Sequence, residues 1–132
     1  MEKLKVLIVD DEQDAIEYIK AVLDDIAAFE YIDAADGVAG IDMAQSYDPD
    51  LIILDVMMPK MDGFKVFYEL RKHKNTKHIP VIMLTGVAEK SGITFFKKDM
   101  KNYLGSEPFE YLEKPLNPEQ LSNTIKKVFE LV

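Results

Sequence analysis

Short runs of apolar residues, rich in Val, Ile and Leu, recur along the chain and are separated by more polar segments. Unbroken apolar runs favour strands that are buried on both faces, as in a parallel sheet. We predict strands at residues 4–9, 51–54 and 80–84, with weaker strands at 29–34 and 109–112. The mixed composition of residues 29–34 places that strand near an edge of the sheet.

Between these runs, apolar residues recur every three or four positions, which is the spacing of an amphipathic helix. Three such stripes consist of Ile16, Ile19, Leu23 and Ile26; of Phe64, Val66, Phe67 and Leu70; and of Leu121, Ile125, Val128 and Val132. A shorter helix is predicted at residues 37–47, before the turn signal Asp48-Pro49. Another stripe predicts a helix at 93–104, behind a loop at 87–92. Strands and helices therefore alternate, which predicts a doubly wound α/β fold with helices on both faces of a five-stranded sheet.

The length of 132 residues is typical of one domain, and we expect a single domain over residues 1–132 with no output domain. The chain carries 24 acidic and 16 basic residues, a net charge of −8 that repels nucleic acid and anionic lipid. The apolar runs are far shorter than the ~20 residues of a membrane helix. The N-terminal segment also lacks the long apolar region of a signal peptide. We therefore expect a cytoplasmic protein that binds neither nucleic acid nor membrane.

The chain contains no cysteine and two histidines. The absence of cysteine excludes disulfides, thiolate zinc sites and thiol nucleophiles, and two histidines are too few for a histidine-rich metal centre. Any metal is therefore expected to be a hard cation that binds to oxygen ligands.

Polar residues follow four of the predicted strands. In open parallel sheets, ligands bind beyond the carboxyl ends of the strands. The first strand ends at Asp10 and Asp11, the third at Asp55, the fourth at Thr85 and the fifth at Lys114. The expected ligand-binding edge thus carries three carboxylates, a hydroxyl and an ammonium group.

Three carboxylates at one edge repel one another. Two unit charges ~4 Å apart at an effective dielectric of ~20 interact by about 4 kcal/mol, and a divalent cation relieves this repulsion. An oxygen-only ligand set favours Mg²⁺. A metal, a lysine and a hydroxyl around a carboxylate also suit phosphoryl transfer to an aspartate. We predict that Asp55 accepts a phosphoryl group, that Asp10 and Asp11 hold Mg²⁺, and that Lys114 and Thr85 bind phosphoryl oxygens.

Four segments around these strand ends have a specific order and spacing. They are residues 6–12 (VLIVDDE), 49–63 (PDLIILDVMMPKMDG), 84–86 (LTG) and 111–115 (YLEKP). In these segments, which are spread over the whole chain, the sequence resembles the receiver domain of two-component response regulators. The resemblance implies a flavodoxin-like sheet with strand order 2-1-3-4-5. It also implies a sensor histidine kinase or a histidine phosphotransfer protein as phosphoryl donor, and a protein-interaction switch or a relay intermediate as function.

The resemblance also assigns individual roles. It implies that Mg²⁺ binds through Asp11, Asp55 and the main-chain carbonyl of Met57. It further implies that Thr85 and Tyr111 reorient together on phosphorylation. The Lys114-Pro115 peptide bond is expected to be cis.

Two features depart from the family. The interval from Thr85 to Lys114 is 29 positions, longer than usual by about two helical turns. In the family this region forms the common output face, so we expect partner docking there to differ from the usual mode. In the family, the side chains two residues after the acceptor and two residues after the hydroxyl tune hydrolysis of the phosphoryl group. Here these residues are Met57 and Val87, whose apolar side chains cannot position a water. We therefore expect slow loss of the phosphoryl group.

Other functions compete with this interpretation. A receiver fold that acts as a docking module independently of phosphorylation stays open as the alternative. A dehalogenase-type phosphatase is disfavoured because Met57 stands where that family has a second acid. A flavodoxin is disfavoured because acidic residues 10–12 would repel a flavin phosphate. Taken alone, the pair Asp10-Asp11 after a strand is also typical of a helix cap. An aromatic residue in a terminal strand, such as Tyr111, is also typical of ordinary core packing.

Overall fold

Each predicted apolar run forms a strand of one parallel sheet in the computed structural model, which describes residues 3–86 and 106–131. The strands are β1 (Lys5–Val9), β2 (Glu30–Ala34), β3 (Leu51–Asp55), β4 (Val81–Thr85) and β5 (Glu110–Glu113). Their order is β2-β1-β3-β4-β5, and every pairing is parallel. The flavodoxin-like order is therefore confirmed.

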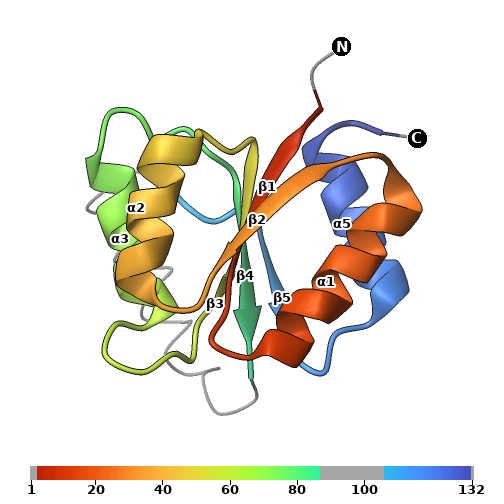
Figure 1. Cartoon of the computed structure of the whole chain (residues 1–132), viewed down its shortest axis with the longest axis horizontal. Helices are drawn as coiled ribbons and strands as arrows, with labels where there is room; N and C mark the ends of the chain where they lie inside the picture. The colour runs from red at the N-terminus through yellow and green to blue at the C-terminus, as the bar shows by residue number, and fades with distance from the viewer. Residues whose placement is uncertain (1–2, 87–105, 132) are drawn as a thin grey trace.

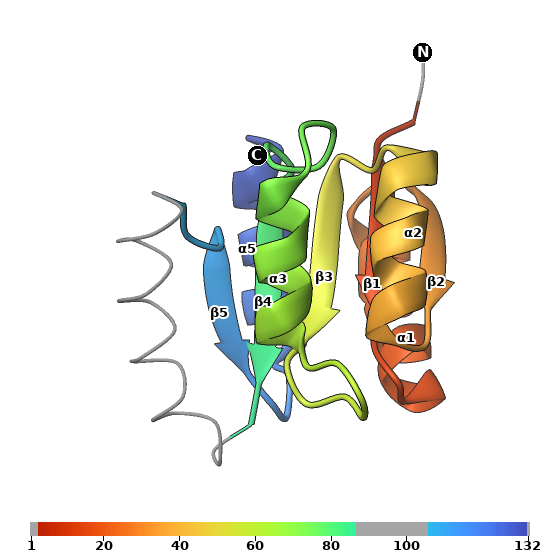
Figure 2. The same cartoon turned by 90° about the vertical axis from the view of Figure 1, so that its left-hand side faces the viewer.

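Helices cover both faces of this sheet (Figures 1 and 2). The described helices are α1 (Gln13–Ile26), α2 (Gly37–Tyr47), α3 (Gly63–Lys72) and α5 (Pro118–Val128). Helices α1 and α5 lie on one face, and α2 and α3 on the other. The helix predicted at residues 93–104, the loop at 87–92 and Val87 lie outside the described residues. Helix α5 ends at Val128, four residues before Val132, the last member of its predicted stripe.

Burial along the strands follows their position in the sheet. Every residue of β3 and β4 is buried, and β1 is buried from Val6 onward. The strand predicted near an edge, β2, is an edge strand with one buried residue, Ala34. The other edge strand, β5, likewise buries Leu112 alone. Continuous apolarity thus marks the strands that have a neighbour on each side.

Two apolar clusters fix the helices to the sheet. Side chains of α2 and α3, among them Ala44 and Phe67, pack with β1, β3 and β4 on one face. Side chains of α1 and α5, among them Leu23 and Leu121, pack on the other face. Burial of a Leu or Phe side chain in these clusters contributes roughly 1.5 to 3 kcal/mol. The helices therefore cover both faces of the sheet, and the polar groups lie at its carboxyl edge.

Three helices begin with a side-chain cap. Asp36, Asp62 and Asn117 accept hydrogen bonds from main-chain N–H groups in the first turns of α2, α3 and α5. Helix α2 ends at Tyr47, and its C-cap residue Asp48 is left-handed, with a φ of 54°. The predicted turn at Asp48-Pro49 therefore follows the helix directly. These caps fix where α2 and α3 start relative to the carboxyl ends of the strands. Within the described residues, no helix combines the length and apolar composition needed to span a bilayer.

Candidate functional site

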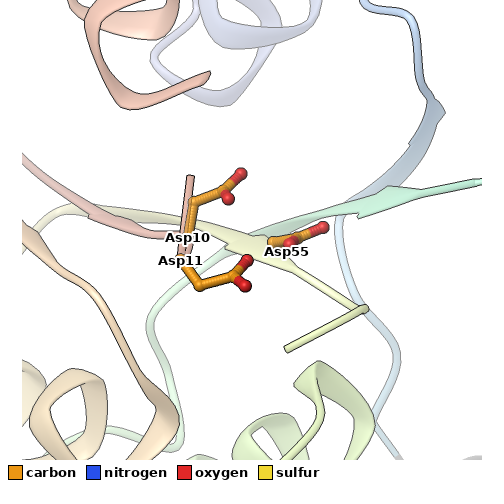
Figure 3. A group of neighbouring side chains, drawn as sticks. All are labelled: Asp10, Asp11 and Asp55. Atoms are coloured by element: carbon orange, nitrogen blue, oxygen red, sulfur yellow. The ribbon is translucent and has the colours of Figure 1, made fainter. Parts of the chain in front are cut away.

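The carboxyl ends of β1 and β3 bring three carboxylates together (Figure 3). Asp10 and Asp11 follow β1 directly, and Asp55 is the last residue of β3. One oxygen from each of the three lies within 4.8 Å of the other two. The predicted acidic cluster is therefore formed in the structure, and its oxygens are close enough together to share a cation.

The two neighbouring aspartates differ in their surroundings. Asp10 is fully buried, and its Oδ1 accepts a hydrogen bond of 2.9 Å from the main-chain N–H of Glu12. Asp11 is exposed. The N-cap residue of α1 is Glu12, which makes no side-chain capping bond. Helix capping therefore does not account for Asp10 and Asp11.

Lys114 connects two of these carboxylates. Its Nζ lies 3.1 Å from Asp10 Oδ2, 3.2 Å from Asp55 Oδ1 and 3.8 Å from Glu12 Oε1. Its main-chain N–H donates to the Thr85 carbonyl over 2.6 Å, which attaches the end of β5 to the end of β4. The Lys114-Pro115 bond is cis, as expected. The lysine predicted to lean into the site does so.

The site carries more negative than positive charge. Burial raises the pKa of the Asp55 carboxyl to about 7, and the charge of Asp10 adds to this effect while Lys114 opposes it. Burial by itself would lower the pKa of Lys114, but the attraction of Asp55 and Asp10 outweighs it and raises that pKa. One ammonium thus faces a buried pair of carboxylates. A bound cation would relieve the repulsion that remains.

The remaining predicted residues lie at and beside this cluster. Thr85 is the buried last residue of β4, and its Oγ1 lies 3.5 Å from the Leu112 carbonyl. Met57 lies in the loop after β3 with 61% of its surface exposed. Tyr111 pairs with Met83 across β4 and β5 and packs against the apolar cluster under α2 and α3. Burial, followed by the charge of Glu107, raises the pKa of the Tyr111 phenol.

Two residues at the site received no individual role from the sequence. Glu12 brings a further carboxylate toward Lys114. Gly63, the buried first residue of α3, donates its N–H to the carbonyl of Val56, the residue after Asp55, over 2.8 Å. Both lie inside the segments that resemble receiver domains. The resemblance itself assigned no role to either residue.

A model of the response regulator receiver domain family matches residues 6–126. The chain belongs to this family. It is a receiver domain of the two-component response regulator type, a class of signalling phosphoacceptor domains that interact with histidine kinases.

Relatives and solved structures agree with this assignment. The alkaline phosphatase synthesis transcriptional regulatory protein PhoP of Bacillus subtilis is 34% identical over 94% of this chain and 48% of its own length. The chain thus spans about half the length of the curated relatives it matches. The chemotaxis protein CheY4 of Vibrio cholerae is 35% identical with a TM-score of 0.78, and 96% of this chain and 99% of that chain are covered. A response regulator receiver domain protein from Clostridium thermocellum has 29% identity and a TM-score of 0.81, with 96% and 94% covered.

Proposed function

We propose that Asp55 is the phosphoryl acceptor of this receiver domain. The observation that supports this most strongly is the position of its carboxylate. Asp55 is 2% exposed, ends the central strand β3, shares a cluster with Asp10 and Asp11, and has the Lys114 ammonium 3.2 Å from Oδ1. A buried carboxylate beside a lysine is shielded from bulk water, and its position at the edge of the sheet places it where a phosphoryl donor could approach.

The transfer itself requires little covalent chemistry from the protein. A carboxylate oxygen of Asp55 forms a bond to phosphorus while the bond from phosphorus to the donor histidine nitrogen breaks, and that imidazole leaves as a neutral group after taking up a proton. Lys114 stabilises the charge on the phosphoryl oxygens, and Asp10 holds Lys114 in place through its 3.1 Å ion pair. The Thr85 hydroxyl donates a hydrogen bond to another phosphoryl oxygen.

Mg²⁺ fits the donor set of this site. The cluster offers three carboxylate oxygens within 4.8 Å of one another. Burial, with the charge of Asp10 adding to it, raises the pKa of Asp55 to about 7, so a cation that compensates its negative charge is favoured there. Asp10, Asp11 and Asp55 would hold the ion together with the main-chain carbonyl of Met57. When bound, the ion supplies charge neutralisation for the carboxylates and the incoming phosphoryl group.

Phosphorylation then changes the surface that partners recognise. A phosphoryl group adds roughly −1.5 to −2 charge at Asp55 and biases a pre-existing conformational equilibrium. We propose that Thr85 and Tyr111 reorient, because Thr85 ends β4, the strand beside Asp55, and Tyr111 lies on β5, the next strand.

We propose that the phosphoryl donor is a sensor histidine kinase or a histidine phosphotransfer protein. We propose a cytoplasmic phosphoacceptor domain whose catalysis is limited to its own phosphorylation and slow dephosphorylation, and which binds neither nucleic acid nor membrane through residues 1–132.

Intact mass after incubation with acetyl phosphate and Mg²⁺ tests the proposal. The wild type should gain the mass of one phosphoryl group, and Asp55→Asn should gain none. Asp36→Asn is the matched control, because Asn also caps a helix and Asp36 lies at the N-terminus of α2 rather than in the cluster. A wild type that gains no mass refutes the proposal. The docking alternative, by contrast, leaves the three clustered carboxylates without a role, and no observation on the described residues favours it.

A further inference from the structure

Gly63 lies against the main chain of the proposed acceptor. A Cβ atom built on Gly63 would lie 2.8 Å from the Cα of Val56 and in closer contact still with the carbonyl oxygen of Asp55. Real Cβ atoms essentially never approach other heavy atoms within 3.0 Å. Because no left-handed φ requires glycine at this position, the constraint is one of space. The first turn of α3 can approach the end of β3 this closely only without a side chain at residue 63.

Hydrogen bonds hold the residue after Asp55 from two sides. The N–H of Val56 donates to the Leu84 carbonyl on β4 over 2.9 Å, and the Val56 carbonyl accepts from the Gly63 N–H over 2.8 Å. Val56 is therefore fixed between the neighbouring strand and the start of α3. The direction in which Asp55 leaves the sheet, and the course of the chain toward Met57, depend on both contacts.

Gly37 occupies the same position in α2 and provides a comparison. Both glycines are the first helical residue after a capping aspartate, Asp36 or Asp62, whose Oδ1 accepts from an N–H two residues beyond the glycine. A Cβ atom on Gly37 would be 2.8 Å from Cγ2 of Val66 and 3.1 Å from the side chain of Met61. An added methyl at residue 37 thus pushes against side chains, whereas one at residue 63 pushes against the main chain of the acceptor.

We propose that Gly63 is a positioning residue for phosphoryl acceptance at Asp55. Its missing side chain lets α3 hold the Asp55–Val56 peptide group in the orientation that aims the Asp55 carboxylate at Lys114 and at the carboxylates of Asp10 and Asp11. The inference rests on the proposed role of Asp55. On this proposal, the N-terminus of α3 helps to set the orientation of Asp55 in the site.

The test compares Gly63→Ala with Gly37→Ala in the full chain. Both variants are first shown to be folded by circular dichroism, in 1 M trimethylamine N-oxide if necessary, since this osmolyte favours the compact state. Phosphorylation by acetyl phosphate is then followed under saturating Mg²⁺. Because a displacement of about 1 Å at a reacting group can cost ~100-fold in rate, Gly63→Ala should slow the maximal rate by roughly 10- to 100-fold. Gly37→Ala should remain within about threefold of the wild type.

A second readout does not depend on phosphorylation or on metal. The amide NMR shifts of residues 55–57 in EDTA should change in Gly63→Ala and stay near the wild-type values in Gly37→Ala. Equal rates in wild type and Gly63→Ala overturn the positioning role while leaving the acceptor role of Asp55 intact. Equal rate losses in both variants, or a Gly63→Ala chain that does not fold even in the osmolyte, overturn it in favour of a general packing role. A wild type that is not phosphorylated removes the proposed function itself.

Discussion

Lys114 and Asp55 belong to the ends of β5 and β3, the strands on either side of β4, yet Lys114 Nζ lies 3.2 Å from Asp55 Oδ1. Two strand spacings of ~4.8 Å separate these strands, and the long side chain of Lys114 crosses that distance. The ammonium group therefore reaches the proposed acceptor from two strands away, whereas the Thr85 hydroxyl on β4 lies 3.5 Å from the Leu112 carbonyl.

Replacing Lys114 by Ala should destabilise the metal-free protein at pH 8. The substitution removes the positive charge that faces the buried carboxylates of Asp10 and Asp55, so that both remain uncompensated. We expect the free energy of unfolding to fall by about 2 kcal/mol in urea denaturation. The control is Lys72→Ala, which breaks an exposed ion pair with Glu69 and should change stability by less than about 1 kcal/mol. Equal losses in both variants would contradict a special role for the Lys114 charge.

Replacing Asp55 by Asn should stabilise the metal-free protein in a pH-dependent way. The pKa of Asp55 is raised from 3.8 to about 7, so the folded state keeps a proton that the unfolded state releases. The wild type should therefore lose stability as pH rises from about 4 to about 7, with the full penalty present above 7. At 1.36 kcal/mol per pKa unit, Asp55→Asn should be more stable by about 2 to 4 kcal/mol at pH 8.

Urea denaturation in EDTA at pH 5 and pH 8 measures this difference. Asp25→Asn, which removes an exposed carboxylate of α1, is the control and should show no growing advantage at high pH. A stability gain from Asp55→Asn that is the same at both pH values would show that ionisation of Asp55 carries no penalty.

Mg²⁺ should stabilise the folded protein through the three carboxylates. A ligand at 100 times its Kd adds about 2.7 kcal/mol to the free energy of unfolding, which thermal melts with and without MgCl₂ will detect as a higher Tm. Asp11→Asn should lose most of this increase and Asp36→Asn should keep it. Because a proton on Asp55 competes with the ion, Mg²⁺ affinity should fall as pH drops below about 7. If NaCl at the same ionic strength raised the Tm equally, the effect of MgCl₂ would be screening of the charges and not binding.

Loss of the phosphoryl group should be slow. Met57 is exposed beside the acceptor, and its thioether cannot donate a hydrogen bond to an attacking water. After removal of acetyl phosphate, intact mass should show a half-life of minutes rather than seconds without an added phosphatase. Met57→Asn, which introduces an amide that can orient water, should shorten it several-fold. Val38→Asn, at another exposed apolar position, should leave it unchanged. A wild-type half-life of seconds would refute this expectation.

The sequence predicted the strands, and it predicted that the carboxylates and Lys114 meet at one edge of the sheet. Unbroken apolar runs mark the central strands β1, β3 and β4, and the mixed residues 29–34 mark an edge. In a parallel sheet the ends of the strands share one edge, so polar residues that follow them must meet. The convergence of Asp10, Asp55 and Lys114 follows from that topology.

Tertiary distances were beyond the sequence. Nothing in the sequence distinguishes the buried Asp10 from the exposed Asp11, because the two are adjacent and chemically identical. The contact of Gly63 with Asp55 depends on how closely α3 approaches β3, which no spacing rule reports. The approach of Glu12 to Lys114 likewise joins residues that are far apart in the chain.

Mapping the modified residue tests the central claim most directly. Borohydride reduces an aspartyl phosphate to homoserine, so peptide mass spectrometry after acetyl phosphate, Mg²⁺ and borohydride identifies the acceptor. We predict homoserine at position 55. Its amount should be smaller in Lys114→Ala, and none should form without acetyl phosphate. Homoserine at Asp10 or Asp11 instead, or at none of the aspartates of a wild type treated in this way, would contradict the assignment of Asp55 as the acceptor.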